Sequence, residues 1–222
     1  FLFTPPTSRG RRARLCRGRQ SCDSSHMDVF SYHLANTTVG TTLRALTSPP
    51  IASHVHGLLH AEWMASMTLG SSIVSPSRMK LRQLAVFAKW KDSNAIDEFL
   101  VGTQSGRTLA EGWHVRLEFQ RRWGHVDEFD GLPERVGEQN PDAPVVAVTI
   151  ARMKLSQVPR FVRWGKPVEK LVRDHPGITL ATAAIRLPRT VSTFSVWKTQ
   201  RAMIEMVHGT SSIPEPERHA MA

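Results

Sequence analysis

After residue 27, the first half of the chain shows a succession of hydrophobic patterns that predicts strand, helix, strand, strand, helix, strand. Strands are indicated where apolar and polar residues alternate, and helices where apolar residues recur three or four positions apart. Thr37 can cap the first helix, and Pro49-Pro50 would end it. In order, the predicted elements are a strand at 28–35, a helix at 37–50, strands at 57–70 and 79–90, a helix whose apolar face holds Ala95, Ile96, Phe99 and Leu100, and a strand at 112–124.

The second half repeats this succession as far as its last helix. FSVWKTQRAMIEMVHGT at 194–210 is a close relative of FAKWKDSNAIDEFLVGT at 87–103, at a constant offset of 107 positions. Aromatic, charged and glycine positions coincide without a gap, which shared periodicity does not require, so we interpret the pair as an internal duplication. The other predicted elements are a strand at 144–154, a helix at 156–177 capped by Ser156 and kinked at Pro167, and strands at 178–187 and 191–197.

This order of elements is that of the ferredoxin-like unit. One such unit leaves a sheet face uncovered, and two can bury these faces against each other. The predicted fold is therefore α+β, with two tandem ferredoxin-like (βαββαβ) repeats that form an α/β barrel. The predicted domains are a first repeat at 27–124, a polar linker rich in Gly and Pro at 125–143, and a second repeat at 144–222.

The end of the second repeat differs from that of the first. No counterpart of the strand at 112–124 follows Ala222, so the last strand of the second repeat is expected to be missing. Pro214 and Pro216 forbid a helix that continues to the end. We therefore expect the last helix to stop near His208 and residues 209–222 to form a loop.

Positive charge is concentrated at the start of the chain. The 222 residues carry a net charge of +10, and residues 1–26 hold six arginines against one aspartate, so this segment and the remainder each carry +5. The segment lacks hydrophobic periodicity and is expected to be disordered. It could be a basic arm for nucleic acid, an Arg- and Ser-rich organelle address, or non-native sequence ahead of a start at Met27. The last interpretation is favoured, because the first convincing strand follows Met27 at once.

The cysteines and the apolar runs bear on the compartment. Both cysteines, Cys16 and Cys22, lie in the basic segment, so neither disulfides nor a thiolate metal site can belong to the body of the chain. A cytoplasmic setting fits this usage. No apolar run approaches the length needed to span a bilayer. We expect a soluble protein without a transmembrane segment, peripheral to a membrane only through an apolar substrate.

Histidines offer one candidate metal site. His54, His56 and His60 are evenly spaced, so on a strand they would point to one face, and Glu62 follows them. The favoured interpretation is nonetheless that of ordinary turn histidines near a strand entry, because Gly57 interrupts the series. Trp90 and Trp197 are interpreted as duplicated core anchors. No Gly-rich dinucleotide fingerprint and no Gly-x-Ser-x-Gly elbow is present.

Four stretches carry a family resemblance. TLGSSIVSPSRMKLRQLAVFAKW, AEGWHVRLEFQRRWG, ARMKLSQVPRFVRWGKPVEKLVRDHPGITLATAAI and STFSVWKTQRAMIEMVHG, spread over most of residues 28–210, resemble the spheroidene monooxygenase family. The resemblance implies a dimeric α/β-barrel fold and an oxygenase that acts on a carotenoid. The related fold group includes haem-binding peroxidases, haem-degrading enzymes and cofactor-free quinol monooxygenases. Fold and oxygenase class carry over more securely than the substrate.

The fold group also points to a haem site. Its haem ligand comes from a helix of one half, and His208 and His219 lie at the end of the second half, where the first half has Val101 and, approximately, Thr108. An imidazole suits iron because one nitrogen ligates while the other donates to an orienting acceptor. PERHAMA resembles the His-containing helix of relatives, so His219 is the first candidate for the haem iron and His208 the second. Arg121 and Arg122 are candidates for a haem propionate, with a solvated strand end as the alternative.

The leading hypothesis is a haem-dependent monooxygenase that oxidises an apolar carotenoid- or isoprenoid-like substrate with an unknown electron donor. Met64, Met67, Met203 and Met206 would suit either a core or an apolar ligand. Cofactor-free oxygenation of a quinol, and a barrel that binds a hydrophobic ligand or a partner without chemistry, are the alternatives. A homodimer is compatible with the fold. Nucleic-acid binding ranks last, because it rests on residues 1–26 alone.

Overall fold

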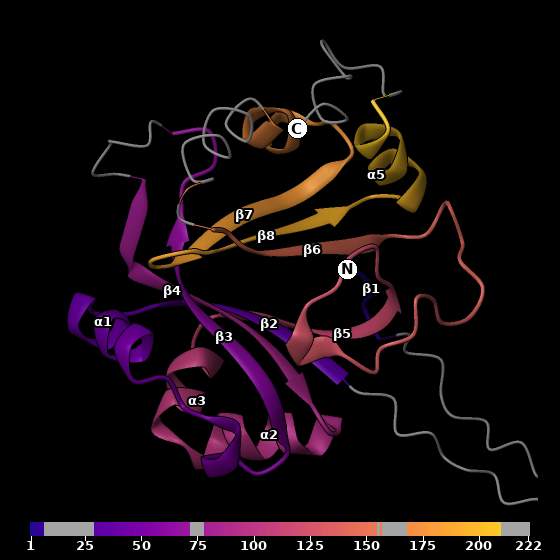
Figure 1. Ribbon diagram of the computed structural model, residues 1–222. Coiled ribbons are helices and arrows are strands. Elements are labelled where there is room, and N and C mark those ends of the chain that lie inside the picture. The colour runs from indigo at the N-terminus through magenta and orange to yellow at the C-terminus, as the bar shows by residue number, and fades with distance from the viewer. Residues whose placement is uncertain (7–28, 72–77, 155, 157–167, 210–222) are drawn as a thin grey trace, which may run out of the picture.

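Eight antiparallel strands close into a barrel in the computed structural model, and helices pack on its outer surface (Figure 1). The structure describes residues 1–6, 29–71, 78–154, 156 and 168–209. Around the barrel the strands follow the order β1-β5-β2-β4-β3-β7-β8-β6, and β6 returns to β1. The predicted α+β barrel is therefore confirmed.

The first repeat contributes the adjacent strands β5-β2-β4-β3, which is the order of a ferredoxin-like sheet. Helices α2 and α3 cover its outer face together with α1. The elements are β2 (Val29–Asn36), α1 (Val39–Thr47), the 3-10 turn η1 (Ala52–His54), β3 (Leu58–Met67), β4 (Met79–Trp90), α2 (Ser93–Gly102), α3 (Gln104–Ala110) and β5 (Trp113–Arg121).

The second repeat contributes β6-β8-β7, and the same sheet order then requires a fourth strand beside β6. The start of the chain occupies that place. Its elements are the 3-10 turn η2 (Asp127–Phe129) in the connecting segment, β6 (Val145–Arg152), a helical stretch at 168–174, β7 (Ile178–Arg186), β8 (Thr190–Trp197) and α5 (Gln200–Val207). None of the helices in the described ranges is both long and apolar enough to cross a membrane.

β1 (Leu2–Thr4) is the fourth strand of the second sheet. Phe3 pairs with Phe119 of β5 on one side and with Val146 of β6 on the other, so this short strand joins the two repeats. Leu2 and Phe3 are fully buried. The prediction of a disordered segment 1–26 is therefore wrong for Leu2–Thr4, because buried apolar side chains and two hydrogen-bonded neighbours offset the loss of chain entropy. Residues 7–26 lie outside the described residues.

The duplication extends to local details that the sequence does not display. Both sheets carry the same irregularity in their second strand, between Leu58 and His60 and between Ile178 and Leu180. The helix after each third strand begins with a capping side chain: Asp92 accepts from the Ala95 amide at 2.9 Å, and Thr199 from the Ala202 amide at 3.2 Å.

The tryptophans occupy equivalent places in the two repeats. Trp90 and Trp197 are both buried, and each donates its indole N–H to a serine hydroxyl at 2.8 Å, Ser31 in one case and Ser195 in the other. Their interpretation as core anchors agrees with this packing. The first helix departs slightly from prediction: Thr38, not Thr37, caps α1, because the Thr37 hydroxyl is bound to that of Thr42 at 2.6 Å.

Aromatic side chains fill the barrel interior. Phe3, Phe30 and Phe87 lie within 5.7 Å of one another by ring centroids. Phe129 joins this cluster from η2, at 5.9 Å from both Phe30 and Phe87. The connecting segment predicted as a polar linker thus also closes the end of the barrel where β2 begins, with Leu132 buried behind Phe129.

The last two helices agree with prediction where the structure describes them. α5 ends at Val207, with His208 as its capping residue, so the predicted stop near His208 is confirmed. The helix predicted at 156–177 is present at 168–174 and ends before Pro176. Residues 157–167, with Pro167, and residues 210–222, with His219, lie outside the described residues.

Candidate functional site

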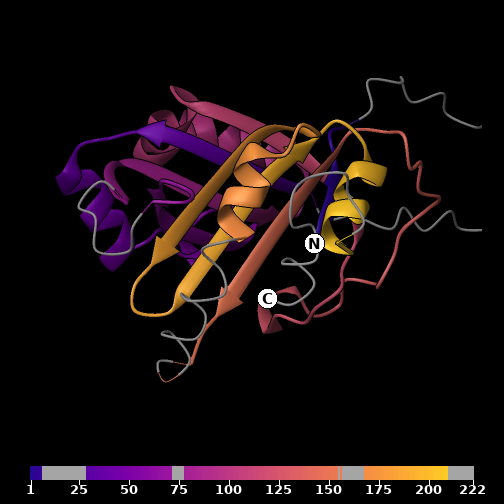
Figure 2. The ribbon, with the colours of Figure 1, turned by 90° about the horizontal axis from the view of Figure 1, so that it is seen from above.

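A groove of about 480 Å³ separates α5 from the outer face of β6. α5 stands beside β6 and β1 at this edge of the second sheet (Figure 2). We call this cavity the α5 groove. Its lining residues are Phe1, Trp123, Gly124, His125, Val126, Ala147, Val148, Thr149, Ile150, Met203, Ile204, Val207 and His208.

The walls of the α5 groove are mainly apolar, and strand and helix periodicities explain why. Successive residues of β6 point to opposite faces, so Ala147 and Thr149 face α5 while Val148 packs in the barrel core. From α5, Ile204 and Val207 lie on the side that faces the sheet, and Val207 remains partly exposed. Small side chains on the strand leave a space that the helix does not fill.

Two imidazoles lie at the rim of the α5 groove. His208 is the capping residue of α5, where its backbone N–H donates to the Ile204 carbonyl at 2.9 Å. His125 lies in the segment after β5, with Nε2 3.1 Å from an Asp127 oxygen and Nδ1 3.1 Å from an Asp130 oxygen. Both contacts can be hydrogen bonds only if both ring nitrogens of His125 carry protons.

The arginines predicted for a haem propionate lie near this rim but do not line it. The Arg121 guanidinium carbon is 4.9 Å from the centre of the Trp123 ring, a cation–π arrangement. Arg122 contacts the Gly124 carbonyl at 3.5 Å and holds the Glu134 carbonyl through its backbone N–H. Both side chains are therefore directed at neighbouring residues of their own segment.

These residues do not complete a haem site. A ligating histidine is normally oriented by an acceptor on its second ring nitrogen. Within the described part of the chain, the His208 ring has no such partner, and neither arginine reaches the groove. The apolar walls suit a hydrophobic molecule. His219, the first candidate for the iron, is outside the described residues.

The corresponding position in the first repeat is closed. His33 of β2 is the first-repeat counterpart of Thr149 of β6. The strand registers show this, because Val29 pairs with Trp90 in the same way as Val145 pairs with Trp197. His33 is fully buried, and its Nε2 lies 2.9 Å from the Ser31 hydroxyl. The space around it leaves no room for a water molecule.

Burial controls the charge of His33. Loss of solvent, with the nearby charges of His114 and Arg116, lowers the pKa of His33 to about 3, so the ring is neutral in the folded protein. Among the described residues, neither His33 Nδ1 nor the indole N–H of Trp63 has a hydrogen-bond partner. The outer face of the first repeat around His33 is therefore closed to a ligand.

The histidines considered as a possible metal cluster, His54, His56 and His60, do not come together. His54 lies in η1, and exposed His56 pairs with Glu98 at 3.1 Å. His60 alone reaches Glu62, at 3.0 Å. Glu128 of η2 then completes a group of three possible metal ligands within 4.8 Å of one another.

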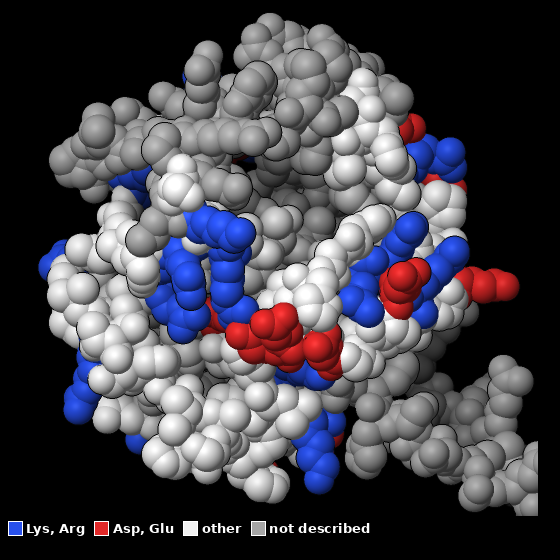
Figure 3. All heavy atoms as spheres, in the orientation of Figure 1, with Lys and Arg blue, Asp and Glu red and all other residues white. Residues whose placement is uncertain are grey.

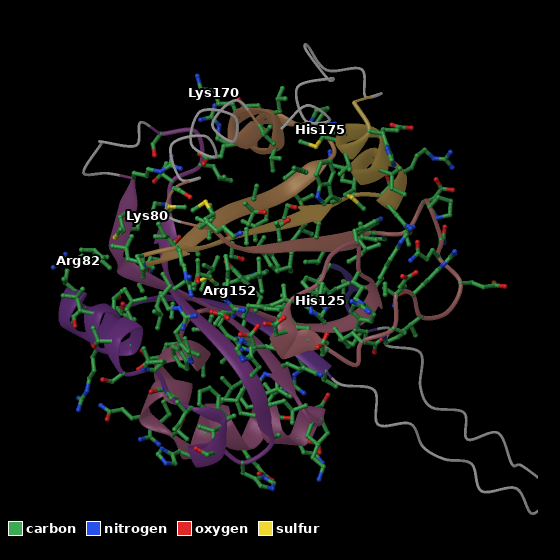
Figure 4. All side chains as sticks on the ribbon, viewed as in Figure 1. Lys80, Arg82, His125, Arg152, Lys170 and His175 are labelled. Carbon is green, nitrogen blue, oxygen red and sulfur yellow. The ribbon has the colours of Figure 1, made fainter. Side chains whose placement is uncertain are left out.

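Arginines already neutralise this group. Arg152, at the end of β6, bridges Glu62 and Glu128, and Arg186 lies 2.8 Å from the second Glu62 oxygen (Figure 4). Burial acts to raise the pKa of Glu62, but the His60 hydrogen bond and the two arginines hold it below its usual value. Acidic and basic side chains lie next to one another on this face (Figure 3). A cation would have to displace Arg152, so the cluster is an ion-pair network.

Several of these residues were not identified from the sequence. Glu128, Arg152 and Arg186 come from three segments that only the barrel brings together. His125 and Trp123 lie in the segment treated as a strand end and linker. A signal for the α5 groove did exist: at position 208 the second repeat has His where the first has Val101, and that difference marks the groove rim.

Some solved structures are similar to this chain at low sequence identity. No protein-family model and no curated protein matches this sequence. Among solved structures, the chain is similar to a "putative monooxygenase" from Lactobacillus acidophilus NCFM, with 11% identity, a TM-score of 0.31 and coverage of 88% of this chain and 86% of the other.

Two further structures show the same level of likeness. An anthrone oxidase-like protein has 13% identity, a TM-score of 0.29 and coverage of 89% of this chain and 84% of its own. A monooxygenase-like protein from Listeria innocua has 10% identity, a TM-score of 0.28 and coverage of 88% and 84%.

Proposed function

We propose that the protein is a monooxygenase that acts on an apolar small molecule bound in the α5 groove. The observation that carries the proposal is the unfilled, apolar space under α5, at a position where the first repeat is closed. A concave apolar site with few polar groups is the usual form of a small-molecule site. The stretches that resemble the spheroidene monooxygenase family favour the reaction class and a carotenoid- or isoprenoid-like substrate.

The reaction class sets what the site must supply. A monooxygenase places one atom of O₂ on its substrate and reduces the other to water with two further electrons. These electrons come either from an external donor through a cofactor such as haem, or from an electron-rich substrate such as a quinol. Because the described residues do not complete a haem site, we assign no step to haem. Haem-dependent catalysis would need a ligand outside the described residues, such as His219.

The chain's own groups have simple roles in this proposal. Ala147, Ile204 and Val207 exclude water around an apolar substrate. His208 is the one imidazole at the rim without a carboxylate partner among the described residues, so it can accept a proton from a substrate hydroxyl. His125, held between Asp127 and Asp130, places an imidazole ring at the rim beside the substrate.

Filling the groove tests the site. Thr149→Phe places an aromatic ring in the space under α5, and Thr108→Phe adds the same ring at a partly exposed position of α3, outside the groove. Binding of farnesol is measured by displacement of the fluorescent apolar dye 8-anilinonaphthalene-1-sulfonate. We expect Thr149→Phe to weaken farnesol binding at least about tenfold, because the bound molecule loses its apolar contacts. Thr108→Phe should leave it unchanged. Equal binding by both variants would contradict the proposed site.

The reaction is tested separately, by O₂ consumption and product mass with farnesol or with 1,4-naphthohydroquinone. Protein prepared with and without added haemin is compared, with a protein-free control for spontaneous oxidation. Incorporation of one ¹⁸O atom from ¹⁸O₂, lost in Thr149→Phe, would support the monooxygenase. If farnesol binds in the groove but both compounds are recovered unchanged in every preparation, the alternative function is favoured: a barrel that binds a hydrophobic ligand without chemistry.

A further inference from the structure

A second cavity, of about 530 Å³, lies at the end of the barrel where β2 ends and β5 begins. It is separate from the α5 groove and shares no lining residue with it. We call it the barrel-end pocket. Its lining residues are Leu34, Asn36, Gln83, Glu111, Gly112, Trp113 and Leu180.

The pocket opens into the barrel. Side chains alternate along a strand, and the even positions of β2, such as Phe30 and Tyr32, pack in the barrel core. Leu34 and Asn36 continue that inward row. The same parity holds on the other strands, so the strand residues that line the pocket are all inward-facing: Leu34, Asn36, Gln83, Trp113 and Leu180.

The opposite end of the barrel shows what this end lacks. There, Phe129 closes the interior, and the ion-pair network of Glu62 and Arg152 lies beside it. The registers make Asn36 the counterpart of Arg152, since Asn36 pairs with Gln83 as Arg152 pairs with Thr190. The open end therefore has two uncharged amides, Asn36 and Gln83. The equivalent positions at the closed end are occupied by Arg152 and Thr190.

Trp113 forms an aromatic wall of the pocket. Its side chain is 45% exposed, and its ring meets Phe194 edge-on at 5.9 Å, which fixes its orientation. The turn before it is also fixed: a Cβ at Gly112 would lie 2.2 Å from the Leu34 carbonyl oxygen, so only glycine fits. The indole face is thus held in place without being covered.

The polar groups of the pocket have unused hydrogen-bonding capacity. Within the described ranges, the side chains of Asn36, Gln83 and Glu111 have no hydrogen-bond or ion-pair partner. Each amide offers both donors and acceptors, and the carboxylate offers acceptors only. An apolar ligand would desolvate these groups without replacing their bonds to water.

Charge argues against an anionic ligand. Glu111 would repel it, and the nearest basic residues of β4, Lys80 and Arg82, line an adjoining cavity and not the barrel-end pocket itself. Figure 4 shows both at the outer edge of the sheet. A nucleotide or an acidic sugar would therefore lack a cation in the pocket.

We propose that the barrel-end pocket binds an uncharged sugar ring, with one C–H face stacked on Trp113 and its hydroxyls bonded to Asn36, Gln83 and Glu111. A sugar ring combines an apolar face with an edge of hydroxyls that donate and accept, which matches the two kinds of lining group. The pocket volume lies in the usual range for small-molecule sites. This site is independent of the proposed oxygenase reaction.

The test uses saturation-transfer NMR and tryptophan fluorescence on the full chain with D-glucose, D-galactose, D-mannose and N-acetyl-D-glucosamine at millimolar concentrations. We expect saturation of the C–H protons on one face of at least one of these sugars. Trp113→Ala should weaken its binding at least about tenfold, because the stacking surface is lost. Trp123→Ala, which removes an exposed indole at the α5 groove, should leave sugar binding unchanged.

Three further comparisons keep the outcome decisive. Trp113→Phe retains an aromatic face, so it should bind the sugar more tightly than Trp113→Ala even if the alanine variant folds poorly. Glu111→Gln should retain glucose-like binding and improve binding of D-glucuronate, because the repulsion is removed. Cyclohexanol should not compete. Absence of saturation transfer from all four sugars to the folded protein, or equal binding by Trp113→Ala and the unchanged protein, would overturn the proposal.

Discussion

The two repeats share the same arrangement of strands and helices but differ in the side chains that pack on their outer faces. In the first, α2 and α3 cover a continuous apolar cluster that includes Trp63 and Phe99. In the second, the register makes Ala183 the counterpart of Trp63, and the offset of 107 makes Met206 that of Phe99. At the α5 groove itself, Thr149 of β6 stands where the first repeat has the buried His33 of β2. The first repeat thus has a closed outer face, and the second keeps a groove on its own.

The largest expected effect concerns the duplicated tryptophans. Trp90→Ala should lower the free energy of unfolding by about 3–5 kcal/mol, because it opens a cavity in a closed cluster. Trp197→Ala should cost less, because half-buried residues around it can relax. Urea unfolding measures both, with Trp123→Ala as an exposed control expected within about 0.5 kcal/mol. A larger loss for Trp197→Ala would contradict the difference in packing between the repeats.

Next in size is the contrast between the two barrel ends. Glu62→Gln should destabilise by about 3 kcal/mol, because it removes the charge that Arg152 and Arg186 face in a buried position. The register makes Thr182 the counterpart of Glu62, and Thr182→Val removes only the 3.1 Å hydrogen bond to Tyr32, for about 1 kcal/mol. Urea midpoints of the two variants at pH 7 test this. If Glu62→Gln lowers the free energy of unfolding no more than Thr182→Val does, the network adds no more stability than one hydrogen bond.

The two repeats should also differ in how their stability depends on pH. The first has His33, and its counterpart in the second, Thr149, does not titrate. The pKa of His33 falls from 6.5 to about 3 on folding, so below pH 6.5 the unfolded chain binds a proton that the folded chain does not. Stability from this source is therefore lost as pH falls from about 6.5 towards 3, by up to about 1.4 kcal/mol per pH unit. His33→Gln should show a shallower decline in urea midpoint between pH 6.5 and 4.5. Equal slopes would mean that His33 becomes protonated in the folded state.

The smallest effect should be the same in both repeats. Asp92→Ala and Thr199→Ala each remove a helix cap and should each cost about 1 kcal/mol in the free energy of unfolding. Thermal or urea unfolding of the two variants provides the measurement. A cost confined to Asp92→Ala would indicate that α5 is held by its packing and not by its first turn.

The frame could be predicted from sequence because local patterns specify it. The alternation in β4 and β8 and the repeated Trp90 and Trp197 set the strands, the helices and the offset of the two copies. The offset of 107 positions does not hold for the earlier strands of the two repeats. Corresponding residues differ by 116 positions between β2 and β6 (29 and 145) and by 120 between β3 and β7 (58 and 178). Loops of different length hide the match, so the counterparts Trp63 and Ala183 were not compared.

The features that escaped prediction depend on distant contacts. A strand of three residues has no period to detect, and Phe3 finds Phe119 and Val146 far along the chain. Glu62 was noted as a possible ligand, but its true partners, Arg152 and Arg186, lie on strands of the other repeat. Phe129 stands in a polar stretch, and only the barrel end explains why it is buried.

The position of β1 has a topological consequence. The second sheet takes its fourth strand from residues that precede the whole first repeat, so in chain order this unit is a circular permutation of the first. Moving Leu2–Thr4 from before β2 to a point after α5 would leave the neighbours β5 and β6 unchanged. Both repeats would then have the same order of elements. The barrel specifies where each strand lies, and the order in which the chain supplies the strands is a separate and adjustable property.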